Sequence, residues 1–243
     1  MKIKALALDL DGTALKPDTS LGEQTTNVLK ELISRGYYVL FCTGRAVEAA
    51  EKYRHAIGAA GPMVFFNGAE VIDMPSGNII SMNLLDLDVV EFGIEIARSM
   101  GVHFQIYLPP GIDCGNGKYE ALVVDKLSPE AEMYRNHTGI IPVVKDLKEA
   151  IALPGLRGCI KAMFITDPAR HDEIRNKMIE RFGDRIYIAR TYATFLEIMN
   201  AGVSKGEGLK IVMENLGLKR EEVMALGDEE NDILMFNVAG FSA

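Results

Sequence analysis

The sequence predicts an α/β protein in which a parallel-sheet domain is interrupted by a second domain of the α+β class. Over residues 1–83, short apolar runs alternate with amphipathic segments, which is the pattern of βαβ units. From about residue 84 the alternation gives way to mixed strands and helices around irregular loops, and it resumes near residue 195. We therefore expect a discontinuous core domain, residues 1–83 and 191–243, around an inserted domain, residues 84–190.

Three strands and two helices are expected in the first half. The strands are the apolar runs 2–8 (KIKALAL), 37–42 (YYVLFC) and 63–66 (MVFF). Ser20 and Glu23 have the spacing of a capping box, and Gly36 is expected to end the helix that follows in a left-handed conformation. The second helix should run to about Ile57, and residues 75–78 (PSGN) predict the turn of a hairpin after the third strand.

The second half is expected to contain the inserted domain and then the return to the core. Ser128 followed by Pro129 predicts a helix start, with an N-cap and proline in the first turn. Further helices are expected at 86–100 and 169–182. Strands are expected at 102–108, 119–124 and 159–165, with a loop (PPGIDCGNG) after the first of them, and at 195–199 (FLEIM) and 223–227 (VMALG) in the core, where a helix begins near Lys205.

Polar side chains follow four of the predicted core strands: Asp9, Thr43, Asn67 and Asp228. In an open parallel sheet, ligands bind outside the carboxyl ends of the strands, so these residues should share one edge. Asp9 and Asp11 would point to the same side if the backbone stays extended through them. Carboxylates that close repel one another unless a cation lies between them, and hard oxygen ligands suit Mg²⁺ better than zinc.

Composition excludes several classes of protein. The formal net charge is −8, and no run of Lys or Arg is long enough for a nucleic-acid interface. Three scattered cysteines, Cys42, Cys114 and Cys159, predict neither a disulfide framework nor a zinc site. No signal peptide or membrane-spanning stretch is recognisable. We therefore expect a cytoplasmic protein with no nucleic-acid or membrane partner; the sequence does not indicate its oligomeric state.

Four motifs resemble those of the haloacid dehalogenase superfamily: residues 9–13 (DLDGT), Thr43, Lys205 and residues 227–232 (GDEEND). Asn67-Gly68-Ala69, the insert and GVSKG before the last motif are similar to its Cof-like phosphatases, subfamily IIB. The resemblance covers the whole core, and the insert by position and approximate length only. It implies a Rossmann-like core, a cap domain and a Mg²⁺-dependent phosphatase acting on a small phosphate ester.

The resemblance also implies roles for the three strand-end acids. Asp9 would be the nucleophile that takes the phosphoryl group, and Asp11 the general acid and then the base for water. Asp228 would bind Mg²⁺ together with the Asp9 carboxylate and the Asp11 carbonyl. Each of these acids also has a structural interpretation, because strand-end Asp and Asp-Gly pairs commonly stabilise turns.

Phosphate contacts are implied in the same way. Thr43 and Lys205 would contact the transferred phosphoryl group and act in catalysis, although a lone Lys on a helix is usually a surface residue. Arg45 is either an anion contact or a solvated helix residue. The expected substrate-binding residues are Thr43, Gly44, Asn67, Gly68, Lys205 and Asn231, with Asp232 supporting the metal ligand.

The substrate is less well defined by the sequence. Sugar phosphates are the expected class; the alternatives are a phosphorylated sugar acid or osmolyte precursor, such as mannosyl-phosphoglycerate, or a non-catalytic metabolite sensor. In the cap, Tyr107, Arg135 and His137 are specificity candidates because they are polar or aromatic, although such residues are more often ordinary surface or core residues. Relatives continue beyond the last motif with a strand and a helix, whereas this sequence stops at Phe241-Ser242-Ala243. Either the sequence is truncated or, if the protein ends here, one edge of the sheet would be short.

Overall fold

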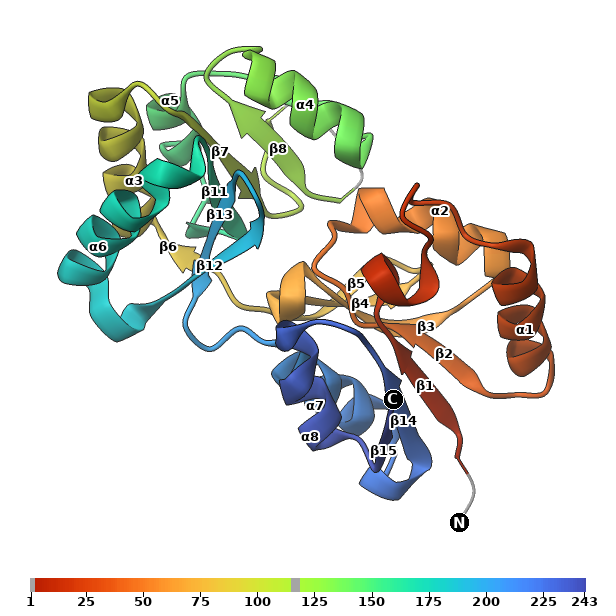
Figure 1. The fold of residues 1–243 in the computed structure, drawn as a ribbon. Coiled ribbons are helices and arrows are strands. Elements are labelled where there is room, and N and C mark those ends of the chain that lie inside the picture. Colours follow the sequence, from red (N-terminus) through yellow and green to blue (C-terminus); the bar gives the residue numbers. More distant parts are fainter. Residues whose placement is uncertain (1–2, 115–118) are drawn as a thin grey trace. The chain divides into compact units, whose positions relative to one another are not determined.

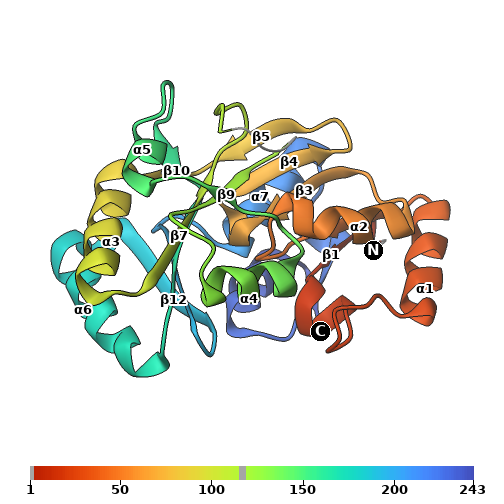
Figure 2. The ribbon, with the colours of Figure 1, turned by 90° about the horizontal axis from the view of Figure 1, so that it is seen from above.

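A computed structural model describes residues 3–114 and 119–243 (Figures 1 and 2). The chain forms two compact units, residues 1–82 with 203–243, and residues 83–202. The start of the first predicted strand at Lys2 and residues 115–117 of the predicted loop lie outside the described residues. No described helix has the length and apolar character needed to cross a membrane.

A four-stranded parallel sheet with the order β15-β14-β1-β2 organises the first unit. Its strands are β1 (Ala5–Leu8), β2 (Tyr38–Phe41), β14 (Val223–Leu226) and β15 (Phe241–Ser242). A parallel bridge from Cys42 to Val64 brings β3 (Gly61–Phe65) beside β2. The antiparallel strands β4 (Glu70–Met74) and β5 (Asn78–Met82) extend β3, with the predicted turn between them. The parallel core expected from the alternation is therefore confirmed, and the sheet edge beyond β14 is two residues long.

Helices cover both faces of this sheet. They are α1 (Glu23–Ser34), α2 (Val47–Ile57), α7 (Lys205–Leu216) and α8 (Ile233–Val238). In Figure 1, α1 and α2 lie on one side of the strands, and α7 and α8 lie on the other. The sheet residues Leu40, Val64 and Val223 pack with Leu209 of α7 in one buried apolar cluster. Burial of this cluster fixes the strand ends, and therefore the polar residues after them, relative to one another.

The start of α1 differs from the sequence prediction. Gly22, not Ser20, is the N-cap, because Asp18 accepts bonds from both the backbone N–H and the hydroxyl of Ser20, at 2.9 and 2.6 Å. The capping box predicted from Ser20 and Glu23 is therefore wrong. The predicted end is confirmed, since Gly36 has a φ of 85° directly after the helix.

The second unit is built on a six-stranded mixed sheet with the order β12-β13-β11-β7-β8-β9. Its strands are β7 (His103–Leu108), β8 (Ala121–Val124), β9 (Val143–Val144), β11 (Lys161–Ile165), β12 (Ile186–Tyr192) and β13 (Phe195–Asn200). A two-stranded sheet pairs β6 (Leu85–Asp86) with β10 (Gly158–Cys159). The helices are α3 (Leu87–Met100), α4 (Pro129–Thr138), α5 (Leu147–Ile151) and α6 (His171–Phe182).

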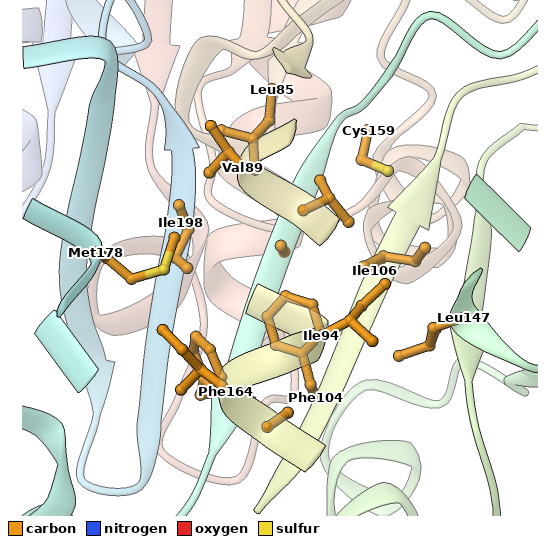
Figure 3. Packing of buried hydrophobic residues seen from close by; sticks show 14 of the residues in the cluster. Leu85, Val89, Ile94, Phe104, Ile106, Leu147, Cys159, Phe164, Met178 and Ile198 are labelled. Atoms are coloured by element: carbon orange, nitrogen blue, oxygen red, sulfur yellow. The ribbon is translucent and has the colours of Figure 1, made fainter. Parts of the chain in front are cut away.

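One apolar cluster forms the core of this unit. Alternate residues of the sheet, such as Phe104, Ile106 and Phe164, pack against Ile94 of α3 and Met178 of α6 (Figure 3). The opposite face carries the other alternate residues of the same strands, including Tyr107 and Lys161. The α+β character predicted for the insert is confirmed.

The return to the core lies later than the sequence predicted. Residues 195–199 were assigned to the core, but β13 pairs antiparallel with β11 and β12 of the second sheet. The second unit therefore runs to Gly202 and not to residue 190. Hydrophobic patterning identified the strand, but it carries no information about which of two sheets the strand joins.

Candidate active site

A buried ion-pair network joins the end of β1 to the start of α7. Nζ of Lys205 donates to Oδ1 of Asp9 at 2.6 Å and to Oδ1 of Asp232 at 2.7 Å. All three residues are buried, with Lys205 only 2% exposed. Lys205 is the first residue of α7, whose N-cap Ser204 accepts a bond from the amide of Glu207. An ammonium at this position cannot be a surface lysine; it neutralises two carboxylates that water does not solvate.

The environment shifts the pKa of both members of the Asp9–Lys205 pair. Burial raises the pKa of Asp9 from its ordinary 3.8 to about 7, although Lys205 opposes this rise. Burial acts to lower the pKa of Lys205, but the Asp9 and Asp232 carboxylates outweigh it and raise that pKa. Lys205 is therefore a fixed positive charge. The remaining upward shift at Asp9 shows that one ammonium, shared with Asp232, does not fully offset the desolvation of the Asp9 carboxylate.

Asp228 lies beside this network at the end of β14. Oδ1 of Asp228 accepts a bond from the hydroxyl of Thr13 at 2.8 Å, across the sheet edge. Gly12 makes the close approach possible, since a Cβ on Gly12 would lie 2.0 Å from Oδ2 of Asp228. Carboxylate oxygens of Asp9, Asp228 and Asp232 all lie within 4.8 Å of one another. Asp9 and Asp228 belong to the predicted metal set, in which Asp11 contributes its backbone carbonyl and Asp232 supports the metal ligand.

The donor atoms in this cluster fit a hard divalent cation. Both oxygens of Asp232 are already engaged, because Oδ2 accepts the amides of Asp228 and Glu229, each at 3.1 Å. Asp232 therefore fixes the loop that carries Asp228, in keeping with its predicted supporting position. Asp9 and Asp228 would be the side-chain ligands, and an added cation between them would offset the desolvation that raises the pKa of Asp9.

The predicted phosphate-binding residues form the neighbouring wall. The carbonyl of Thr43 accepts the amide of Asn67 at 2.9 Å, and Nδ2 of Asn231 donates to Oδ1 of Asn67 at 3.1 Å. A Cβ on Gly44 would lie 3.0 Å from the same Oδ1. Asn67 thus joins the loop after β3 to the loop after β2 through its backbone amide, and to the loop after β14 through its side chain.

Gly68 connects this wall to Lys205. Its φ is 104°, and a Cβ there would lie 2.1 Å from the carbonyl oxygen of Ser204. Only glycine allows the loop after β3 to lie against the N-terminus of α7. The structure therefore brings together all the predicted site residues except the carboxylate of Asp11.

Asp11 instead pairs with Arg45, which the sequence left undecided between an anion contact and a solvated residue. Nε and Nη2 of Arg45 donate to the two oxygens of Asp11 at 2.7 and 2.6 Å. Thr13 was also not singled out, although it ends the DLDGT motif. Both residues have a signal in the sequence: Arg45 directly follows Thr43-Gly44, and Thr13 directly follows Asp11-Gly12.

The three cap candidates have structural contacts within the second unit. The hydroxyl of Tyr107 shares a 2.8 Å bond with that of Tyr134, and both side chains are buried. Arg135 faces Glu132 at 3.7 Å on the surface of α4. The ring of His137 lies tilted against that of Tyr192, with 5.6 Å between centroids, and edge-on to that of Phe195 at 6.2 Å. None of these contacts identifies a substrate.

Comparison with known proteins decides the family. A family model described as haloacid dehalogenase-like hydrolase matches residues 6–243, nearly the whole chain. This chain belongs to the haloacid dehalogenase-like hydrolases. The predicted family is thereby confirmed, together with its α/β core and inserted cap; the Cof-like, subfamily IIB type stays a prediction.

Relatives of this hydrolase include enzymes and solved structures. A 5-amino-6-(5-phospho-D-ribitylamino)uracil phosphatase of Bacillus subtilis is 29% identical over 97% of this chain and 83% of that protein. A Thermotoga maritima crystal structure has a TM-score of 0.83 at 30% identity, covering 99% of this chain and 85% of that one. A subclass IIB sugar phosphatase has a TM-score of 0.74 at 20% identity, with 98% and 86% covered, and supports the fold alone. The hydrolase is a phosphatase of small phosphorylated metabolites.

Proposed function

We propose that this phosphatase hydrolyses a sugar phosphate or a similar phosphorylated polyol with Mg²⁺, through an aspartyl-phosphate on Asp9. The observation that carries the proposal is the bond from Lys205 to Asp9, with Asp228 alongside in the same acidic cluster. A carboxylate held between an ammonium and a cation is ionised without a base, which a nucleophile requires.

The reaction has two steps on the core residues. A carboxylate oxygen of Asp9 attacks phosphorus, the ester P–O bond breaks, and Asp11 gives a proton to the leaving alcohol oxygen. Asp11 then takes a proton from a water that attacks the phosphoryl group, which releases phosphate and restores Asp9. Lys205, Thr43 and the amides of the neighbouring loops would stabilise the phosphoryl oxygens.

Mg²⁺ would be held by the carboxylates of Asp9 and Asp228 and by the carbonyl of Asp11. When bound, it would neutralise charge on the phosphoryl group. Gly44, Gly68, Asn67 and Asn231 would shape the phosphate site, and Asp232 would hold Asp228 in place.

The substrate class rests on relatives. The Bacillus subtilis relative is named for a phosphate on a ribityl chain. A cytoplasmic location stays a prediction, as does the alternative of a phosphorylated sugar acid. No contact among residues 3–114 and 119–243 favours that alternative.

The test is a panel of phosphate esters with Mg²⁺, comprising phosphorylated sugars, sugar acids and a ribityl phosphate. We expect phosphate release that EDTA abolishes, and a hydroxylamine-sensitive phosphoprotein. Asp9→Asn should lose both the phosphate release and the phosphoprotein. Asp73→Asn should lose neither, because Asp73 accepts a bond from Ser76 at the β4–β5 turn of the same unit. Mg²⁺ binding without turnover of any ester would favour the sensor.

A further inference from the structure

Asp11, two residues after the proposed nucleophile Asp9, forms a bidentate ion pair with Arg45. Nε of Arg45 donates to Oδ2 of Asp11 at 2.7 Å, and Nη2 donates to Oδ1 at 2.6 Å. Both residues belong to the first unit, on loops 34 positions apart in sequence. Two parallel bonds fix the plane of a carboxylate as well as its position, which a single bond cannot do.

The two partners differ in how firmly they are held. The side chain of Asp11 is 52% exposed and that of Arg45 only 9%. Asp11 lies in a turn that leaves helical geometry, followed by Gly12 at a φ of 80°. An exposed carboxylate on such a turn has several rotamers open to it, so its orientation depends on the arginine.

Arg45 itself is anchored on several sides. Its amide donates to the hydroxyl of Thr43 at 3.1 Å, and its carbonyl accepts the amide of Phe66 at 3.0 Å. Its guanidinium lies over the ring of Tyr53, 5.4 Å from the centroid. The hydroxyl of Tyr53 donates in turn to the carbonyl of Thr19 at 2.7 Å. These contacts hold the guanidinium of Arg45 in one position.

We propose that Arg45 is a positioning residue that holds the carboxyl group of Asp11 in line with the leaving-group oxygen. This inference rests on the proposed function, in which Asp11 transfers the proton. Arginine binds anions in bidentate fashion through the Nε–Nη2 edge of the guanidinium, and in Arg45 this edge faces Asp11. Arg45 therefore acts on the phosphate ester through the Asp11 carboxyl group. A general acid whose proton does not point at the leaving-group oxygen gives little rate acceleration.

The test uses the dependence of rate on the leaving group. An alkyl alcohol needs a proton as it departs, whereas p-nitrophenolate is a weak base and leaves without one. For Arg45→Met we expect kcat/KM to fall on the order of 10- to 100-fold with the best alkyl phosphate of the panel and by less than about threefold with p-nitrophenyl phosphate. Arg45→Lys keeps the positive charge but cannot make the two parallel hydrogen bonds, so it should show the same selective loss of kcat/KM with the alkyl phosphate. It replaces Arg45→Met in the test if that variant does not fold.

Two further variants make the result specific. In an Asp11→Asn background, Arg45→Met should not further change the ratio of kcat/KM for the alkyl phosphate to that for p-nitrophenyl phosphate. Both substitutions remove the same function, proton transfer to the leaving group. Arg35→Met, which breaks an exposed pair with Glu31, is the matched control and should leave both rates unchanged.

Equal losses with both esters, or additive losses in the double variant, would overturn the proposal, since a phosphate contact or a structural role affects both esters alike. A lack of Mg²⁺-dependent turnover in the unaltered chain would instead count against the proposed function.

Discussion

Lys205 and Asp9 are 196 positions apart in the sequence, and the ammonium of one lies 2.6 Å from a carboxylate oxygen of the other. The bond is buried and is shared with Asp232. Because the core domain is discontinuous, this contact also joins the N-terminal part of the unit to the segment that follows the insert. Lys205 therefore has a structural role in addition to the chemical role that we propose for it.

Removal of the Lys205 charge should destabilise the core. Lys205→Met leaves Asp9 and Asp232 buried without their common partner, which we expect to cost about 3–5 kcal/mol of unfolding free energy. Urea unfolding followed by circular dichroism measures it. Lys210→Met, which removes an exposed pair with Glu207 on the same helix, should change stability by less than about 0.5 kcal/mol. Equal stability of the two variants would show that the buried pair contributes little.

Gly12 should be essential for the position of Asp228. In Gly12→Ala the new Cβ would overlap the Asp228 carboxylate, so we expect loss of Mg²⁺ binding and of phosphatase activity. Gly36→Ala is the matched control, because Gly36 has a similar φ, 85° against 80°, but nothing within 4 Å of its Cβ. It should cost about 1 kcal/mol of stability and leave activity intact. Calorimetric titration with Mg²⁺ and an ester assay separate the two; normal Mg²⁺ binding by Gly12→Ala would contradict the prediction.

Asp232 should act on the metal through the loop that it holds. In Asp232→Asn, an amide group must face either Lys205 or the backbone amides of Asp228 and Glu229, so two donors oppose each other. We expect the Mg²⁺ concentration for half-maximal activity to rise about 10- to 100-fold. Glu230→Gln, an exposed neighbour on the same loop, should leave it unchanged. An unchanged Mg²⁺ requirement in Asp232→Asn would assign Asp232 to folding alone.

His103 in the cap is a partly buried histidine with two partners. Its Nδ1 is 3.0 Å from the hydroxyl of Ser128, and its Nε2 is 3.0 Å from Oε1 of Gln105. Burial lowers its pKa below the ordinary 6.5, although the bond to Gln105 and the charges of Glu130 and Asp125 oppose the shift. The folded state therefore favours the neutral ring.

This shift predicts a pH-dependent contribution to stability. Above about pH 6.5 the ring is neutral in both the folded and the unfolded chain, so the contribution is fully present. As the pH falls below this value the unfolded chain takes up the proton first, and stability is lost. We expect the Tm of the unaltered protein to fall relative to that of His103→Gln between pH 7.5 and 5.5, as measured by scanning calorimetry. Parallel Tm curves for the unaltered protein and His103→Gln would contradict the assignment.

Much of the fold could be predicted because its signals are local. Each apolar run that ends at Asp9, Thr43 or Asp228 specifies a buried strand and the polar residue at its end, and parallel strands bring those ends to one edge. The start of α1 could not be predicted, since Asp18 competes for Ser20 through a turn that spacing alone does not reveal.

Amino-acid sequence by itself determined the family, the two-part organisation and the position of Asp9 and Asp228 after core strands, because motif spacing and hydrophobic periodicity are properties of short segments. Only the tertiary structure decided that β13 joins the cap sheet, that Asp232 completes the acidic cluster, and that Asp11 is gripped by Arg45. These relationships depend on which distant surfaces pack together. Packing is set by the shape and burial of the whole core, which no single segment encodes.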